Sequence, residues 1–279
     1  AVQIEDTTGL TAFGADGFTV GADTDYSDTT GDGMVAWSWK GNGVSGGTLN
    51  ENGNRDSQVN VNTTAGFSIV TWENNNTTGA TVGHGLSQAP DMILNKTTTG
   101  TYGWYCYHSG LDATAPEDYY INLNTTTART DNAADGWNDT APTATIFTLG
   151  AEGTNSVGGM DVVSYCFHNV EGYSKIGSFA GNSVADGPFV YTGFKPAYLL
   201  LRKSTAIASW YVLDNKRNPF NQVLNDLQTN VTDAEATSAN FVDFLSNGFK
   251  MRTSGGAVNS GTLIYAAFAE SPFKYSNAR

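Results

Sequence analysis

A short apolar run recurs three times along the chain, each time entered from a glycine-rich turn. The copies are residues 33–40 (GMVAWSWK), 160–168 (MDVVSYCFH) and 261–269 (GTLIYAAFA), and the phenylalanine-containing segments 17–21, 146–150 and 248–252 precede them. Such runs, bounded by glycines and rich in β-branched and aromatic residues, predict β-strands. Each phenylalanine segment and the run after it therefore predict a hairpin-like unit.

The spacing of matching residues indicates a longer internal repeat. Gly66 matches Gly172 at an offset of 106 positions (172 − 66), and Trp104 matches Trp210 at the same offset (210 − 104). This period is far longer than the roughly 20–50 residues of a solenoid unit and suits a β-sandwich domain. The predicted parts are a partial third repeat with terminal strands only at 1–45, a linker at 46–65, and β-sandwich repeats at 66–171 and 172–279.

Alternation and turn residues predict the strands of each full repeat. They are 67–72, 80–84, 91–96, 104–108, 119–124, 145–149 and 162–167, then 175–179, 189–191, 198–202, 210–213, 249–252 and 263–268, while 218–227 fits a strand or a short helical turn. In strand 104–108 both faces are apolar, which predicts a central strand covered on two sides. The predicted fold class is all-β: tandem antiparallel β-sandwich, jelly-roll-like domains related by internal duplication.

Composition agrees with an all-β fold and narrows the partners. Only 15% of residues are charged, 12% are aromatic, and glycine occurs 32 times. A net charge of −13 argues against a nucleic-acid partner, which needs clustered Lys and Arg. No apolar run approaches the roughly 18 residues of a membrane span, so no membrane insertion is expected. The chain starts partway through what elsewhere is a longer unit, which predicts a fragment or a processed product.

Cysteines and histidines give no sign of a metal or redox centre. Cys106 and Cys166 lie inside apolar strand runs. We expect two buried, reduced and inert thiols, because a bond between them would require adjacent strands in one domain. His84, His108 and His168 lack the spacing of zinc ligands and are expected to be ordinary polar positions.

An acidic turn is the one candidate metal site. Asp23, Asp25, Asp28 and Asp32 offer the carboxylate oxygens that calcium prefers, although their spacing is not that of an EF-hand. The corresponding turns of the other two copies carry a single carboxylate between them. The alternative is a solvated turn rich in Asp, and no other cofactor is expected.

Aromatic residues and polar loops suggest a carbohydrate site. Sugars stack on aromatic rings and bond to polar loops at sandwich rims. Most tryptophans lie in predicted core strands, whereas Trp137 lies in a loop with Asn138 and Asp139 and is the best exposed candidate. The alternative is that these tryptophans belong to the cores.

Carboxylates are numerous, but none forms the pair that a glycosidase uses, about 5–9 Å apart. The candidates are Glu117, Asp118, Asp214, Glu235, Asp243 and Glu270. Asp214 begins the segment Asp214–Arg217, while Arg202 and Lys203 end the preceding strand. Together they predict an Asp–Arg ion pair that closes the edge of a hairpin, rather than a ligand site.

Several long sequence segments resemble those of a known protein family. They are 66–72 (GFSIVTW), 79–90 (GATVGHGLSQAP), 186–196 (DGPFVYTGFKP), 244–252 (FLSNGFKMR) and 265–275 (YAAFAESPFKY). These resemble the C-terminal repeat domains of an uncharacterised family of large marine tailed-phage proteins, which are tail-fibre-like or virion structural proteins. The resemblance covers nearly the whole chain and implies a virion or extracellular location. The resemblance implies no catalytic motif for this chain. Compared with the usual pattern of the family, the chain lacks the front of the first repeat.

Together these features predict a non-enzymatic structural protein of a virion surface, a tail fibre, spike or appendage subunit that assembles and contacts the host. Its partners would be further copies, other virion proteins or a host surface glycan. The alternative is a lectin-like module that recognises host polysaccharide, and a third hypothesis is a polysaccharide hydrolase. The partial copy at 1–45 exposes strand edges, which predicts that a neighbouring chain completes it.

Overall fold

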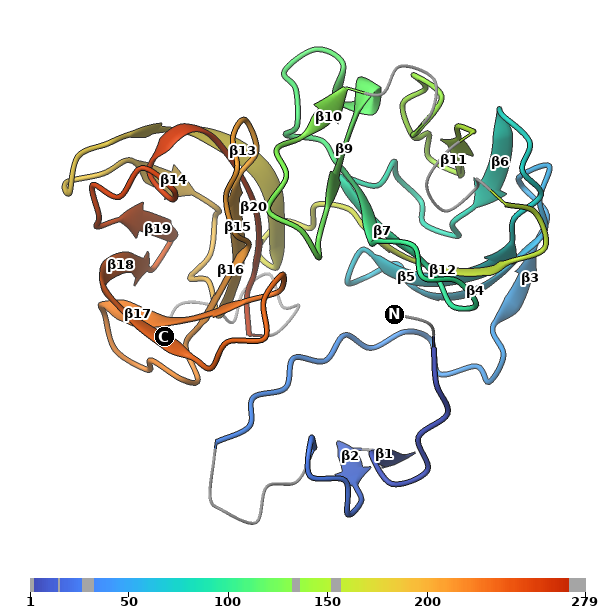
Figure 1. Ribbon diagram of the computed structural model, residues 1–279, viewed down its shortest axis with the longest axis horizontal. Helices are drawn as coiled ribbons and strands as arrows, with labels where there is room; N and C mark the ends of the chain where they lie inside the picture. The colour runs from blue at the N-terminus through green and yellow to red at the C-terminus, as the bar shows by residue number, and fades with distance from the viewer. Residues whose placement is uncertain (1–2, 15, 27–32, 132–135, 152–156, 271–279) are drawn as a thin grey trace.

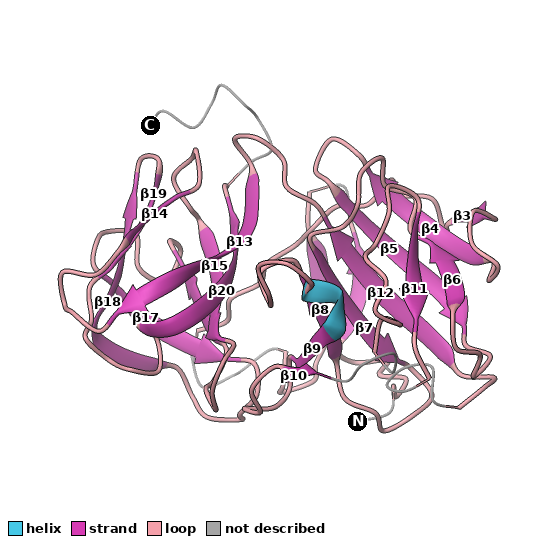
Figure 2. Cartoon of the chain, turned by 90° about the horizontal axis from the view of Figure 1, so that it is seen from above, coloured by secondary structure: helices cyan, strands magenta, loops and turns pink. Residues whose placement is uncertain are grey.

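The computed structural model describes residues 3–14, 16–26, 33–131, 136–151 and 157–270, and these residues form an all-β protein (Figure 1). Two large antiparallel sheets of eight strands each carry most of the chain, and two short sheets of two strands complete it. Figure 2 shows the two large sheets side by side. The all-β prediction is therefore confirmed. No helix in the described ranges is long and apolar enough to cross a membrane.

The first large sheet has the order β10-β9-β8-β7-β12-β5-β4-β3, with the pair β6 and β11 as a separate short sheet. The strands are β3 (Thr48–Asn50), β4 (Ser57–Asn62), β5 (Phe67–Glu73), β6 (Ala80–Gly83), β7 (Met92–Thr97), β8 (Tyr105–His108), β9 (Tyr119–Asn122), β10 (Thr130–Asp131), β11 (Ile146–Leu149) and β12 (Asp161–Phe167), with the 3-10 turn η1 (Pro116–Asp118) before β9. We call this part of the chain the first unit.

The second large sheet has the order β13-β20-β15-β16-β17-β18-β19-β14 and curls into a nearly closed, barrel-like form (Figure 1). Its strands are β13 (Ser174–Asn182), β14 (Phe189–Tyr191), β15 (Tyr198–Lys203), β16 (Tyr211–Asp214), β17 (Val223–Gln228), β18 (Ala236–Leu245), β19 (Gly248–Met251) and β20 (Ser260–Phe268). We call it the second unit. Before both units lies the pair β1 (Leu10–Phe13) and β2 (Phe18–Val20), which stands apart below them in Figure 1.

Among the described residues, side chains gather in three apolar cores. One lies in the first unit between the large sheet and the pair β6 and β11, and another lies inside the curl of the second unit. The third, which we call the joint core, contains side chains of both large sheets. Its buried members are Phe67, Met92, Cys106, Leu111, Ile121, Phe167, Ile176, Leu200, Trp210, Val212, Ile264, Ala266 and Phe268.

Because side chains alternate between the two faces of a sheet, one strand contributes side chains to two cores. In β12, Cys166 packs into the core of the first unit, while its neighbour Phe167 packs into the joint core. In β20, Ala267 and Phe268 divide in the same way between the second unit and the joint core. Successive side chains of a strand point to opposite faces, so strands that are apolar at every position are buried on both.

The two large sheets share a pairing pattern. The local order β5-β12-β7-β8-β9 recurs as β13-β20-β15-β16-β17. Cys106 pairs with Ile121 in the first sheet, and Val212 pairs with Leu227 at the matching place in the second. Both partners are displaced by 106 positions (212 − 106 and 227 − 121), so β8 and β9 pair in the same register as β16 and β17.

In its second and third copies, the recurring apolar run is a central strand and not part of a hairpin. β12 pairs with β5 and β7, while the phenylalanine strand β11 before it pairs with β6. β20 likewise lies between β13 and β15, and β19 pairs with β18 and β14. The expectation of a hairpin-like unit is therefore wrong. In the first copy, residues 33–45 belong to no described strand.

The segment 46–65, expected to be a linker, is part of the first sheet. It contains β3 and β4, and β4 pairs with β5 along its whole length. Val59 is buried in the core of the first unit, and the Ser57 hydroxyl donates to the Gly83 carbonyl at 2.7 Å. The prediction failed because only alternate residues of β4 face the core, and its other positions are polar side chains typical of loops.

Candidate functional site

The acidic turn shows local bonding between its own residues. Asp23 Oδ1 accepts the backbone N–H of Asp25 at 2.8 Å, which is the hydrogen bond of an Asx turn. Asp28 and Asp32 lie outside the described residues. Within the described ranges, no group of three or more His, Cys, Asp or Glu side chains is placed to hold a metal ion.

Trp137 is buried, so the expectation of an exposed indole is wrong. Its side chain is 3% exposed and packs in the core of the first unit, edge-on to Tyr107 and Phe147 with ring centroids 5.7 and 6.3 Å away. Asn138 and Asp139 have φ of 54° and 43°, the left-handed region that these two residue types tolerate best. They form a tight turn closed by the Thr140 N–H on the Trp137 carbonyl at 3.2 Å.

His84 and His108 are buried, and both rings form the same pattern of hydrogen bonds. In each, Nδ1 accepts the N–H of the residue two positions on, at 3.2 Å from Leu86 and 2.9 Å from Gly110. Nε2 then carries the proton and donates to a carbonyl oxygen, Thr143 for His84 and Tyr265 for His108, both at 3.1 Å. Burial lowers the pKa of both imidazoles to about 4. These rings are neutral structural connectors at pH 7.

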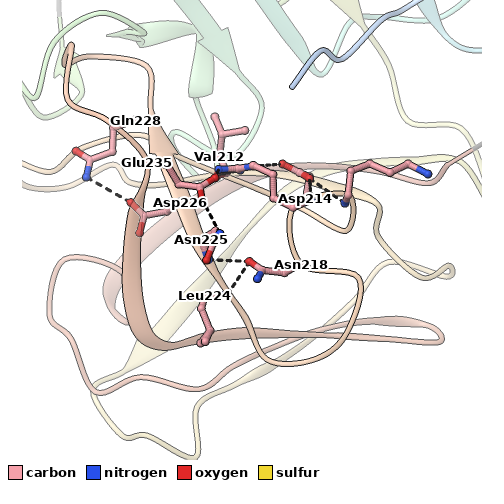
Figure 3. Close-up of polar contacts among 10 residues, drawn as sticks. Val212, Asp214, Asn218, Leu224, Asn225, Asp226, Gln228 and Glu235 are labelled. Carbon is pink, nitrogen blue, oxygen red and sulfur yellow. Dashed lines mark hydrogen bonds and ion pairs between the residues drawn. The ribbon is translucent and has the colours of Figure 1, made fainter. Parts of the chain in front are cut away.

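The predicted Asp–Arg pair is confirmed and forms the centre of a polar cluster (Figure 3). Asp214 is buried at the end of β16, and its Oδ1 accepts the backbone N–H groups of Lys216 and Arg217, both at 2.9 Å. Its Oδ2 accepts from Arg217 Nε at 2.6 Å. A carboxylate that accepts three bonds in this geometry fixes the turn after β16 and holds the guanidinium in place.

Arg217 extends the cluster to the neighbouring strands. It donates to Glu235 at 2.9 Å and to the Val212 carbonyl at 2.9 Å, and Asn225 of β17 donates to the other oxygen of Glu235 at 2.6 Å. Figure 3 shows Asn218 and Gln228 completing the arrangement around β17. Both oxygens of Asp214 and both oxygens of Glu235 are therefore bonded to protein groups. The cluster braces β16 against β17 and the segment before β18.

Arg217 also contacts an aromatic groove at the boundary of the two units. Its guanidinium lies over the Trp37 ring, 5.8 Å from the centroid. Trp37 and Trp39 each meet Tyr198 edge-on, with centroids 5.3 and 5.4 Å apart, and Trp39 meets Phe268 in the same way at 5.3 Å. We call this cavity of about 490 Å³ the inter-unit groove; its walls include Phe67, Met92, Trp104, Tyr165, Leu200 and Phe268.

The groove is apolar and aromatic, with the polar cluster beside it. Trp104 stacks on Tyr165 in its wall, with centroids 6.3 Å apart and planes 20° apart. Burial, together with the negative charge of Asp214, raises the pKa of Tyr198, so its phenol stays protonated. Sequence reasoning assigned these aromatics to the cores of single domains. Only the packing of two units makes a groove of them, and no motif in the sequence signals it.

Fold and site together define an all-β protein of two packed antiparallel units with an aromatic groove at their boundary. Residues 1–272 match the family described as Domain of unknown function (DUF7483), and the chain belongs to that family. No curated protein and no solved structure matches the chain.

Proposed function

We propose that the chain is a non-enzymatic structural protein of a virion surface, a tail fibre, spike or appendage subunit that assembles with further copies or other virion proteins and contacts a host. The observation that carries this proposal is the joint between the two units, which is a continuous apolar core rather than a flexible connection. A rigid joint suits a protein whose role is to transmit force and hold a shape.

A buried arginine strengthens the joint. Arg202 of β15 is 0% exposed, and its guanidinium donates to the carbonyl oxygens of Asn122, at 2.7 Å, and Thr125, at 3.0 Å, and also to that of Thr127. Trp210 Nε1 donates to the same Asn122 oxygen at 2.8 Å. The second unit thus binds the backbone that follows β9 in the first. Such a set of bonds fixes the orientation of the two units.

Internal duplication is part of the proposal. The shared order and register of the two large sheets support an origin in which one antiparallel sandwich-like domain was copied. Repeated domains with polar, weakly charged surfaces suit an extracellular assembly. The family resemblance of the long sequence segments to marine tailed-phage proteins points in the same direction.

Localisation in particles tests the proposal. Antibodies raised against the purified chain should label the surface of purified virions that encode it, as seen by immunogold electron microscopy. Mass spectrometry of the same particles should find the protein in many copies. Labelling confined to infected-cell lysate, with none on particles, would overturn the proposal.

A lectin-like module is the second candidate, and the inter-unit groove is the observation that favours it. Trp104, Tyr165 and Trp39 present ring faces and edges in one cavity, and sugars stack on such rings. Binding to a glycan array that Trp104→Ala abolishes and Phe220→Ala retains would favour this candidate. Phe220 is a suitable control because it is exposed and outside the groove walls.

The third candidate, a polysaccharide hydrolase, gains no support from the carboxylates of the polar cluster. Asp214 and Glu235 both accept bonds from Arg217. A glycosidase needs one carboxyl group that can give up a proton and a second that is free to attack or to activate water. Release of reducing ends from host envelope glycans is the assay that would revive it.

A further inference from the structure

The chain before β3 forms an arm with little support from the two units. We call the described residues 3–14, 16–26 and 33–45 the N-terminal arm. In β1 and β2 every side chain is exposed, and the two strands pair only with each other. Large apolar side chains of the arm face solvent, with Ile4 82%, Phe13 84% and Met34 63% exposed. Figure 1 shows the arm running below both units before it returns to β3.

The arm contacts the folded body in more than one place. At its start, the Gln3 N–H donates to the Thr98 carbonyl of the first unit at 2.8 Å. Trp37 and Trp39 pack against the joint core, which both units build. Their rings meet Tyr198 of β15 and Phe268 of β20, and Trp39 also meets Phe167 of β12 edge-on, with centroids 6.1 Å apart. Besides this ring packing, the Asn62 side-chain amide donates to the Lys40 carbonyl at 3.0 Å. The segment itself belongs to no strand among the described residues.

The arm joins β3 through a glycine hinge. Gly43, Gly46 and Gly47 have φ of 76°, 74° and 82°, in the left-handed region that favours glycine. The Gly47 N–H donates to the Val44 carbonyl at 3.1 Å, which closes a tight turn. The hinge therefore depends on a backbone conformation that glycine permits and other residues strain.

We propose that the place where Trp37 and Trp39 pack on the joint core, beside the inter-unit groove, is an exchangeable seat, and that the Trp37–Trp39 segment of a second copy takes it, so that chains associate by swapping N-terminal arms. The ring contacts are the same whether the arm comes from its own chain or from another, so exchange depends on hinge opening and protein concentration. This inference rests on the proposed function, for which it supplies the contact between subunits. The occupant is a second copy because the rings of Tyr198 and Phe268 already form the contacts that this segment makes.

Arg217 gives the seat its selectivity for the arm. Its guanidinium, fixed by Asp214 and Glu235, lies over Trp37. A cation over an indole face favours Trp above other aromatic residues. The polar cluster beside the groove is thus a positioning device for the arm's first tryptophan.

Crosslinking between differently labelled chains tests the exchange. Ser38 of the arm and Thr229 of the second unit are both exposed and both line the groove. A Ser38→Cys chain is mixed with an isotope-labelled Thr229→Cys chain and treated with a short bismaleimide. The native thiols of Cys106 and Cys166 are buried, and burial raises the pKa of both to about 12, so they do not compete.

We expect a covalent species that contains one chain of each mass. The matched control replaces Thr229→Cys with Ser254→Cys, because Ser254 is exposed but lies outside the groove walls. Equal crosslinking in the control mixture would show random collision and overturn the inference. Crosslinks found only within a Ser38→Cys/Thr229→Cys double variant, with none between chains, would also overturn it.

A hinge variant gives an independent measurement. Gly46→Ala has open space around the new Cβ but strains the closed hinge, because φ is 74°. An extended hinge relieves that strain, so light scattering should show the associated fraction raised about fivefold at equal concentration. Gly17→Ala is the control, since its Cβ also meets open space and its φ is not left-handed. An unchanged fraction in Gly46→Ala would contradict the exchange.

The two proposals fail in different ways. Association in solution without crosslinking between arm and groove would sink arm exchange and leave the virion role standing. Crosslinking between arm and groove, in a protein that immunogold labelling does not find on particles, would overturn the virion role and leave arm exchange standing.

Discussion

The imidazole of His108 donates from Nε2 to the carbonyl oxygen of Tyr265 at 3.1 Å, which links β8 of the first unit to β20 of the second. The tautomer follows from the contacts, because a carbonyl can only accept and Nδ1 already accepts from Gly110. A neutral ring is therefore built into the joint between the units.

Stability should fall in mildly acidic solution. The pKa of His84 and of His108 is lowered by burial to about 4 from an ordinary value of 6.5, so between those values the unfolded chain binds more protons. Above pH 6.5 the two rings make their full contribution to the free energy of unfolding. This contribution decreases as pH falls toward 4, and the loss is about 3 kcal/mol for each ring at pH 4. Urea unfolding at a series of pH values measures the loss. His108→Gln should remove about half of the pH dependence, and an unchanged slope would contradict this assignment.

Arg202→Met should destabilise the protein by about 3 kcal/mol, because the carbonyls of Thr125 and Thr127 would lose this donor and that of Asn122 would keep only Trp210 Nε1. Urea unfolding measures the difference. Lys203→Met is the matched control on the same strand, where the Lys203 side chain bonds to Ser260 at the edge of the second unit. Equal losses in the two variants would show that the joint does not depend on Arg202.

Arg217→Gln should cost about 3 kcal/mol, because the buried Asp214 carboxyl would lose the guanidinium that it is paired with. Lys216→Gln removes the exposed pair with Glu270 from the same turn and should change stability by no more than about 0.5 kcal/mol. A double-mutant cycle with Asp214→Asn should give a coupling energy of about 2 kcal/mol. A coupling near zero would mean that the pair does not brace the turn.

Trp137→Ala should destabilise the first unit by about 4 kcal/mol, since it removes a buried ring that packs on Tyr107 and Phe147. Thermal unfolding followed by near-ultraviolet circular dichroism records the change. Phe220→Ala, at a ring that is 83% exposed, should stay within about 0.5 kcal/mol. A stable Trp137→Ala variant would argue that the ring lies at the surface after all.

Most of the strands could be predicted from the sequence, because buried strands here are apolar on both faces. β12 and β20 stand out as long apolar runs, and a small error in their ends changes nothing. β4 was missed because its alternate residues are Gln and Asn, and β18 was missed because it lies in a segment whose apolar residues begin only near Phe241. Strands with one polar face resemble loops when they are read without their neighbours.

The candidate site was less predictable. The pair of Asp214 and Arg217 is local, three residues apart at a strand end, and the sequence indicates it directly. The turn at Asn138 and Asp139 was interpreted as a rim loop, although Trp137 beside it is buried. Exposure of a single side chain depends on where its turn points, and that depends on contacts distant in sequence.

By itself the sequence determined an all-β chain, the central apolar strands and two cysteines buried as free thiols, because these follow from local alternation and burial preference. Tertiary structure decided the rest. It placed Trp37 and Trp39 in a groove between the units, paired β11 with β6 instead of β12, and set Arg202 against the backbone after β9. These relationships join residues far apart in the chain, so they depend on how whole sheets pack and not on any local pattern.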